Sequence, residues 1–190
     1  MLDCGPSGVW QSRSERLTVE VTELLLEEDI VFRLPAGGKK SALSKIAARL
    51  AKRADMDEAH IRAGLLDRER SSSTALGNGV AVPHAILDDL VHPVASFALL
   101  KEAVDFDAPD NTPVDLLLTL VWPRAAVREF LPTLASACRL LRRRVLRDML
   151  RQARTPTEMF AILRFRLETV ESEIGYHPEG IGTSRPSGEI

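Results

Sequence analysis

One histidine in the middle of the chain stands among residue types that hold a phosphate group. A neutral imidazole is an adequate nucleophile near neutral pH, so His84 could accept a phosphoryl group and carry it as phosphohistidine. The groups that could surround this phosphate are hydroxyls, the N–H groups of a glycine turn and two guanidinium groups, supplied by Ser73, Thr74, Gly77, Asn78, Gly79, Arg68 and Arg70. The sequence therefore predicts a phosphoacceptor site at His84, with Arg68 orienting and neutralising the phosphate.

The backbone before His84 combines a rigid residue, Pro83, with a glycine-containing turn over 77–79. Pro83 has its φ fixed at about −65° and biases the residue before it towards an extended conformation. The short apolar strand over 80–82 should therefore end there and hold the imidazole on a stiffened loop. Upstream, the turn over 77–79 permits positive φ and close approach of another backbone, as a tight turn beside an anion requires. A Gly-x-Gly pair alone is a weak signal, and the neighbouring arginines and hydroxyls supply the specificity.

Hydrophobic periodicity predicts the elements that must position this stretch. Helices are expected over 39–52, from about residue 57 towards Arg68, from 127 onward and after the Thr155-Pro156 pair, and strands over 30–34, 80–82, 95–100 and 115–121. The apolar stripe of the helix from 127 consists of Leu131, Leu134, Cys138, Leu141 and Val145. The second helix would deliver Arg68 at its C-terminal end. The predicted class is a single α/β domain, with a mixed, mostly central β-sheet flanked by helices on both faces.

Length and composition bound the organisation of the chain. With 190 residues, 45% of them hydrophobic, it can bury one sizeable core rather than two. The segments over 1–15 and 169–190 lack periodicity and are predicted to be flexible tails, which leaves one domain over 16–168. The net charge of −2 argues against a surface built throughout to hold nucleic acid.

Cysteine usage and apolar runs indicate where the protein works. Cys4 and Cys138 are far apart and lie in no C-x-x-C pair, so neither a disulfide framework nor a structural metal site is expected. The longest apolar runs fall far short of a membrane span, and the first residues lack the apolar centre of a signal peptide. We therefore expect a cytoplasmic protein without membrane insertion.

An arginine-rich run in the second half of the chain allows two interpretations. Its members are Arg139, Arg142, Arg143, Arg144, Arg147, Arg151 and Arg154. They could form a nucleic-acid stripe or a docking face for an acidic partner. Apolar residues interleave at helical spacing and no aromatic residue stands beside the arginines for base stacking. A solvated helix face is therefore preferred, and nucleic acid is not expected as a partner.

No cofactor or metal is expected. The segment 38–41 (GKKS) matches only the end of a phosphate-binding loop, because the glycine required earlier is absent, and it is interpreted as a helix start. The residues that could suggest a metal-dependent hydrolase are His84, Asp88, Asp89 and His92. Their spacing matches no closed ligand motif. Phosphate must then come from another protein or a small donor rather than from bound ATP.

Three stretches together resemble a known family. They are Leu66-Asp67-Arg68-Glu69-Arg70, the run from Ser73 to His84, and the run from Phe106 to Leu117 (FDAPDNTPVDLL). They are similar to the enzyme IIA domain of the phosphotransferase system (PTS), mannitol/fructose type. Within that type, the free-standing domain and its FDAxDxxPVDLL pattern resemble the nitrogen-regulatory IIA proteins more than the sugar-specific ones. The resemblance covers roughly residues 17–167.

The resemblance implies a phosphohistidine phosphotransfer protein with a regulatory role rather than a conventional turnover enzyme. His84 would receive its phosphoryl group at Nε2 from a small phosphocarrier protein (HPr-like), and Arg68 would steady the phosphohistidine. The added negative charge would alter the surface seen by regulated partners such as sensor kinases or transporters. A homodimer and a role in sugar transport are left open.

The chain departs from the family at one position near the predicted site. The family carries a second histidine at the start of a His-Leu-x-x-Leu helix, where this chain has FLPTL over 130–134. Phe130 can neither donate a hydrogen bond nor carry a positive charge, although Arg128 could replace the lost donor. The alternative function is therefore an IIA-fold interaction module that has lost phosphotransfer.

Overall fold

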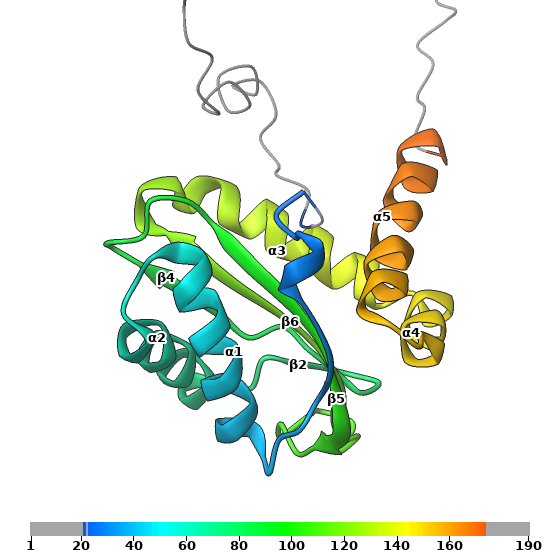
Figure 1. The fold of residues 1–190 in the computed structure, drawn as a ribbon, viewed down its shortest axis with the longest axis horizontal. Coiled ribbons are helices and arrows are strands. Elements are labelled where there is room, and N and C mark those ends of the chain that lie inside the picture. The colour runs from blue at the N-terminus through cyan, green and yellow to red at the C-terminus, as the bar shows by residue number, and fades with distance from the viewer. Residues whose placement is uncertain (1–20, 22, 174–190) are drawn as a thin grey trace, which may run out of the picture.

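Helices cover both faces of a six-stranded mixed sheet in the computed structural model, which describes Val21 and residues 23–173, with side chains up to Phe165 (Figure 1). The flexible tail predicted over 1–15 lies outside the described residues. Most of the tail predicted over 169–190 does so too, although the last helix runs through Glu173. The domain boundaries at 16 and 168 stay predictions.

The sheet is built around one long antiparallel pair of strands. Its strands are β1 (Ile30–Leu34), β2 (Ala75–Gly77), β3 (Val80–Ala81), β4 (His84–Leu87), β5 (Val94–Val104) and β6 (Val114–Pro123). The order is β1-β5-β6-β3-β2, and β4 also pairs with β6. β5 and β6 are antiparallel, β1 is parallel to β5, and β3 and β4 are parallel to β6. The predicted mixed sheet is confirmed, and so are its four predicted strands.

The helices fall on the two faces of this sheet. In the described part of the chain they are α1 (Lys39–Ala54), α2 (Glu58–Ser71), α3 (Val127–Leu141), α4 (Arg144–Gln152) and α5 (Pro156–Glu173), with 3-10 turns at Glu27–Asp29 and Arg124–Ala126. α1 and α2 (cyan to teal) cover one face, and α3 lies on the other, next to α4 and α5 (Figure 1). Each face has its own apolar core, with Ile46 and Leu117 in one and Trp122 and Leu150 in the other.

α1 and α2 form where their apolar residues and caps predict them. α1 buries Ile46 and Leu50 at helical spacing, and Asp55, the residue after its end, takes the left-handed conformation common at helix C-termini. Asp57 is the N-cap of α2, and its side chain accepts a hydrogen bond 3.2 Å long from a backbone N–H of the first turn. The helix that begins after this cap carries Arg68 in its last turn.

The apolar stripe predicted from 127 onward is divided between two helices. α3 ends at Leu141, where the buried guanidinium of Arg147 donates a 2.9 Å hydrogen bond to the Leu141 carbonyl. A separate helix, α4, then turns Leu146 into the core. The prediction of a single stripe through Leu131 and Val145 was wrong at both ends, because these side chains are 68% and 60% exposed.

His84 begins a strand instead of standing on a loop. β3 ends at Ala81, close to the predicted position, but the carbonyl of Pro83 accepts a hydrogen bond from Leu120 N at 3.0 Å and pairing with β6 resumes. His84 then lies opposite Leu120 in a parallel ladder. The loop prediction was wrong because β6, with ten residues, is long enough to pair with two short strands in succession.

Candidate functional site

Both ring nitrogens of His84 are held by defined partners. Arg68 Nε donates a hydrogen bond to His84 Nε2 at 2.9 Å, and His84 Nδ1 lies 2.9 Å from the carbonyl oxygen of Val82. An arginine has only donors, so Nε2 must present its lone pair and Nδ1 must carry the proton that it donates to Val82. The geometry thus selects a neutral imidazole whose nucleophilic nitrogen is Nε2, beside a cation.

Arg68 reaches His84 because α2 packs closely on β4. A second hydrogen bond, from Arg68 Nη1 to the carbonyl of Ser72 at 2.9 Å, fixes the guanidinium near the end of its own helix. Gly64, one turn earlier on α2, permits the approach: a Cβ there would lie 3.2 Å from the Ala85 Cβ on β4. A larger residue at this position would push α2, and Arg68 with it, away from the strand that carries His84.

Burial of the imidazole holds the pKa of His84 below its ordinary value of about 6.5. The charge of Arg68 also lowers this pKa, whereas the hydrogen bond to the Val82 carbonyl raises it. Because the folded protein binds this proton less tightly than the unfolded chain, the free energy of unfolding should fall as the pH drops below about 6.5.

Replacement of Arg68 by alanine should raise the pKa of His84. Proton NMR titration of the His84 ring measures it, and a wild-type pKa above 6.5 would contradict the geometry.

Phe130 forms one wall of the site. Its ring centroid lies 5.3 Å from that of His84 and 5.8 Å from that of Trp122, and only 3% of Phe130 is exposed. Trp122 is fixed in turn by a 2.8 Å hydrogen bond from its indole N–H to the Ala126 carbonyl. Arg128 is exposed and has no hydrogen bond or ion pair with any described residue, so it does not replace the missing donor in this structure.

The hydroxyl groups predicted to line a phosphate pocket are engaged elsewhere. Ser73 donates to the carbonyl of Phe106 at 2.6 Å. Thr74 is buried and its hydroxyl donates to the carboxylate of Glu69 at 2.5 Å. Arg70, the other predicted phosphate ligand, is exposed and pairs with Asp67. Of the predicted site residues, the structure brings only Arg68 and Phe130 into direct contact with His84.

The glycine turn lies away from His84. Val80 pairs with Leu116 and His84 with Leu120, so the turn before β3 is displaced by about 13 Å along β6 at roughly 3.3 Å per residue. Asn78 N donates to Asp110 at 2.6 Å, and the Asn78 carbonyl accepts from Arg151 at 2.8 Å. The turn therefore contacts Asp110 and Arg151. Gly77, Asn78 and Gly79 do not surround the imidazole of His84 as predicted.

Gly79→Ala should destabilise the protein by about 1–3 kcal/mol, the cost of a non-glycine residue in a strained backbone conformation. Gly79 has a φ of +77°, and a Cβ would meet the Arg151 guanidinium and lie 2.9 Å from Asp115 Oδ1, inside their two-bond ion pair. Urea unfolding measures the loss. Gly37→Ala is the matched control, since a Cβ there has no neighbour within 4 Å and the change should be small. Equal stability of the two variants would contradict the account.

The structure separates the arginine run into structural and exposed members. Arg147 is buried, and Arg151 forms two hydrogen bonds of 2.7 Å with Asp115. Arg144 pairs with Asp148 at 3.5 Å. The predicted solvated helix face is therefore found only in part: Arg139 is exposed on α3, while Arg142, Arg143 and Arg154 are exposed in the links between helices.

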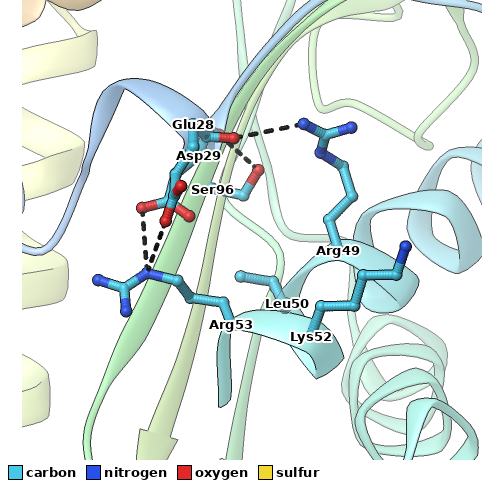
Figure 2. Close-up of a pocket in the computed structure, with 7 residues that line it drawn as sticks. All are labelled: Glu28, Asp29, Arg49, Leu50, Lys52, Arg53 and Ser96. Atoms are coloured by element: carbon cyan, nitrogen blue, oxygen red, sulfur yellow. Dashed lines mark hydrogen bonds and ion pairs between the residues drawn. The ribbon is translucent and has the colours of Figure 1, made fainter. Parts of the chain in front are cut away.

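Sequence reasoning missed a charged cavity at the opposite edge of the sheet. It has a volume of about 480 Å³ and lies between the start of β1 and the last turns of α1. Figure 2 shows Arg49, Lys52 and Arg53 on one side and two carboxylates on the other. Arg53 Nε lies 3.6 Å from Asp29, whose pKa is raised by burial despite that cation. The spacing of the cations on α1 was the available sequence signal. Arg53 is paired with Glu28 and Asp29, and Arg49 donates a hydrogen bond to the Glu28 carbonyl.

The described residues contain neither a candidate membrane-spanning helix nor a candidate metal-ligand cluster. No helix within 21 and 23–173 combines the length and hydropathy needed to cross a membrane. Over the same residues, no three His, Cys, Asp or Glu side chains are grouped as a metal ion would need.

Comparison with known proteins places these features in a family. Residues 23–165 match the family described as phosphoenolpyruvate-dependent sugar phosphotransferase system, EIIA 2. The chain is 36% identical over 146 residues to a nitrogen regulatory protein of Pseudomonas aeruginosa, covering 76% of this chain and 95% of that protein.

Solved structures share the fold. Nitrogen regulatory protein IIA-Ntr from Neisseria meningitidis superimposes with a TM-score of 0.72 at 31% identity, covering 75% of this chain and 98% of that one. The complex of enzyme IIAMTL and phosphorylated enzyme IIBMTL from Escherichia coli gives a TM-score of 0.64 at 21% identity, with 75% and 98% covered. The latter likeness concerns the fold alone.

Proposed function

The chain belongs to the EIIA 2 family of the phosphoenolpyruvate-dependent sugar phosphotransferase system, among its nitrogen regulatory proteins, and on this premise we propose that it accepts a phosphoryl group on His84 Nε2 from a phosphocarrier protein. Its phosphorylation state would then control its partners. The observation that carries the proposal is the pair of contacts on the imidazole, which leaves a neutral ring with its Nε2 lone pair beside a guanidinium.

The transfer needs little beyond positioning and charge neutralisation, because phosphoryl transfer has a loose transition state. The bond from phosphorus to the donor breaks with its electron pair staying on the donor, while the Nε2 lone pair forms the new bond. Nδ1 keeps its proton, so the ring becomes cationic and its hydrogen bond to the Val82 carbonyl strengthens. Arg68 leaves Nε2 and donates to the phosphoryl oxygens instead, where its planar fork fits an anion.

A reconstituted relay tests the proposal. The protein is incubated with phosphoenolpyruvate, the general enzyme I and a phosphocarrier, and the product is analysed for acid-labile, base-stable phosphate. Nitrogen-15 NMR of the labelled ring should place the phosphoryl group on Nε2, because Nδ1 is committed to Val82. Failure to label, or a label on another residue, would overturn the proposal.

Phe130 favours a second candidate, an interaction module without phosphotransfer. It presents carbon atoms to the imidazole where a hydrogen-bond donor would assist the phosphoryl group. In this case the unphosphorylated protein would bind its partners, such as a sensor kinase or a transporter, with the same affinity before and after exposure to the relay. A chain that never labels but still binds a partner supports this candidate.

Phe130→His should raise the phosphorylation rate about tenfold, the effect of one added hydrogen bond to a charged group. The new imidazole would start 5.3 Å from His84, close enough to reach the transferred phosphoryl group. The measurement is the initial labelling rate at fixed phosphocarrier concentration. Phe130→Leu, which keeps the wall apolar, is the control and should not gain rate. Equal rates in the two variants would show that the wall's polarity is irrelevant.

A further inference from the structure

A buried carboxylate next to Arg68 has no part in the chemistry described above. Glu69 is 6% exposed, and its carboxylate accepts hydrogen bonds from Thr74 N at 3.2 Å and from the Thr74 hydroxyl at 2.5 Å. Lys39, from the start of α1, lies 3.4 Å away and also contacts Asp107 at 2.5 Å. Ionisable groups are seldom buried without such partners. The contact joins the end of α2 to the residue that precedes β2.

This contact closes a ring of interactions that contains both nitrogens of His84. On one side, Arg68, the residue next to Glu69 on α2, donates a hydrogen bond to Nε2. On the other side, the Thr74 carbonyl accepts from Val82 N at 3.0 Å, and the Val82 carbonyl accepts from Nδ1. Two links in this ring join α2 to the strand side of the site: the hydrogen bond from Arg68 to His84 and the contact between Glu69 and Thr74.

We propose that Glu69 is a positioning residue, which with Thr74 holds Arg68 and the Val82 carbonyl at a fixed separation across the imidazole. The inference rests on the proposed function, because the geometry that it maintains is the one required for phosphoryl acceptance. A helix end without this contact would move relative to β2, and a displacement of about 1 Å at the reacting atoms is enough to slow a reaction up to a hundredfold. Lys39 supplies the charge that permits the carboxylate to stay buried.

The first test observes the unphosphorylated protein and needs no transfer. Thr74→Val removes the hydroxyl without changing the shape of the side chain, and Thr74→Ser keeps it. In the valine variant and in Glu69→Gln, the Arg68 Nε–H signal should lose its protection from exchange and the His84 nitrogen shifts should indicate mixed tautomers. The serine variant should keep the wild-type signals. Unchanged signals in both disrupted variants would overturn the inference, whether or not His84 is ever phosphorylated.

The second test is a double-mutant cycle on the labelling rate. Glu69→Gln should lower the rate about tenfold in the wild-type background and have almost no further effect in the Arg68→Ala background, because Glu69 acts on the reaction through the position of Arg68. A simple loss of stability would lower the rate by the same factor in both backgrounds, and that result would overturn the inference. If the wild type never labels, the proposed function fails, and the NMR comparison still decides the role of Glu69.

Discussion

His84→Ala is expected to abolish phosphoryl acceptance. The reaction needs a lone pair at Nε2 beside the Arg68 guanidinium, and no other imidazole of the described chain contacts Arg68. Alanine removes the nucleophile, so the loss should be complete within the detection limit of the labelling assay. We expect this to be the largest effect of any single substitution, because the other groups only orient the His84 ring or stabilise the phosphoryl group that it accepts.

The matched controls for His84→Ala are the two other histidines of the described residues. His60 lies 3.3 Å from Asp89, and His92 is exposed in the link between β4 and β5. His60→Ala and His92→Ala should label at the wild-type rate. Circular dichroism would show whether the His84 variant is folded, since the lost ring leaves Phe130 less well packed. Acid-labile phosphate that persists in folded His84→Ala would assign the acceptor to another residue.

The elements of this fold were predictable wherever a long periodic pattern was available. α1 shows its buried face in the spacing of Ile46 and Leu50, and the N-cap of α5 is visible in Thr155, whose hydroxyl accepts from Glu158 N at 3.1 Å. The strands β2 and β4 were missed because three or four residues carry no usable period. β4 pairs with β6 because β6 is long enough to extend beyond β3, whereas β2 pairs with β3, and both pairings are properties of the assembled sheet.

The central contact of the candidate site could be predicted from residue types, but the other residues that lie near His84 could not. His84 and Arg68 meet as expected, although sixteen positions separate them in sequence. The glycine turn is nearer in sequence to His84 and yet belongs to the opposite end of β3. Successive residues of a strand are separated by roughly 3.3 Å, so nearness along the chain is a poor guide to which residues lie beside His84. Glu69 carried no signal of its own, because a buried carboxylate is recognised only from its partners.

Arg68→Ala is expected to lower the labelling rate by roughly 100- to 1,000-fold, the usual effect of removing a donor that stabilises developing negative charge. The variant keeps the nucleophile but loses the cation that lies 2.9 Å from Nε2. A raised His84 pKa adds to the loss near neutral pH, because more of the ring is protonated and lacks a lone pair. The initial labelling rate and its pH dependence measure the two contributions separately.

Arg68→Lys distinguishes charge from geometry at this position. Lysine keeps the positive charge, but it cannot contact Nε2 and the Ser72 carbonyl with the fixed fork that Arg68 uses. The lysine variant should therefore recover about tenfold over alanine and remain well below the wild type. Full recovery would mean that charge alone suffices and that the held orientation of the guanidinium is unimportant. An alanine variant that labels at the wild-type rate would remove Arg68 from the mechanism and, with it, the reason to expect that Glu69 positions it.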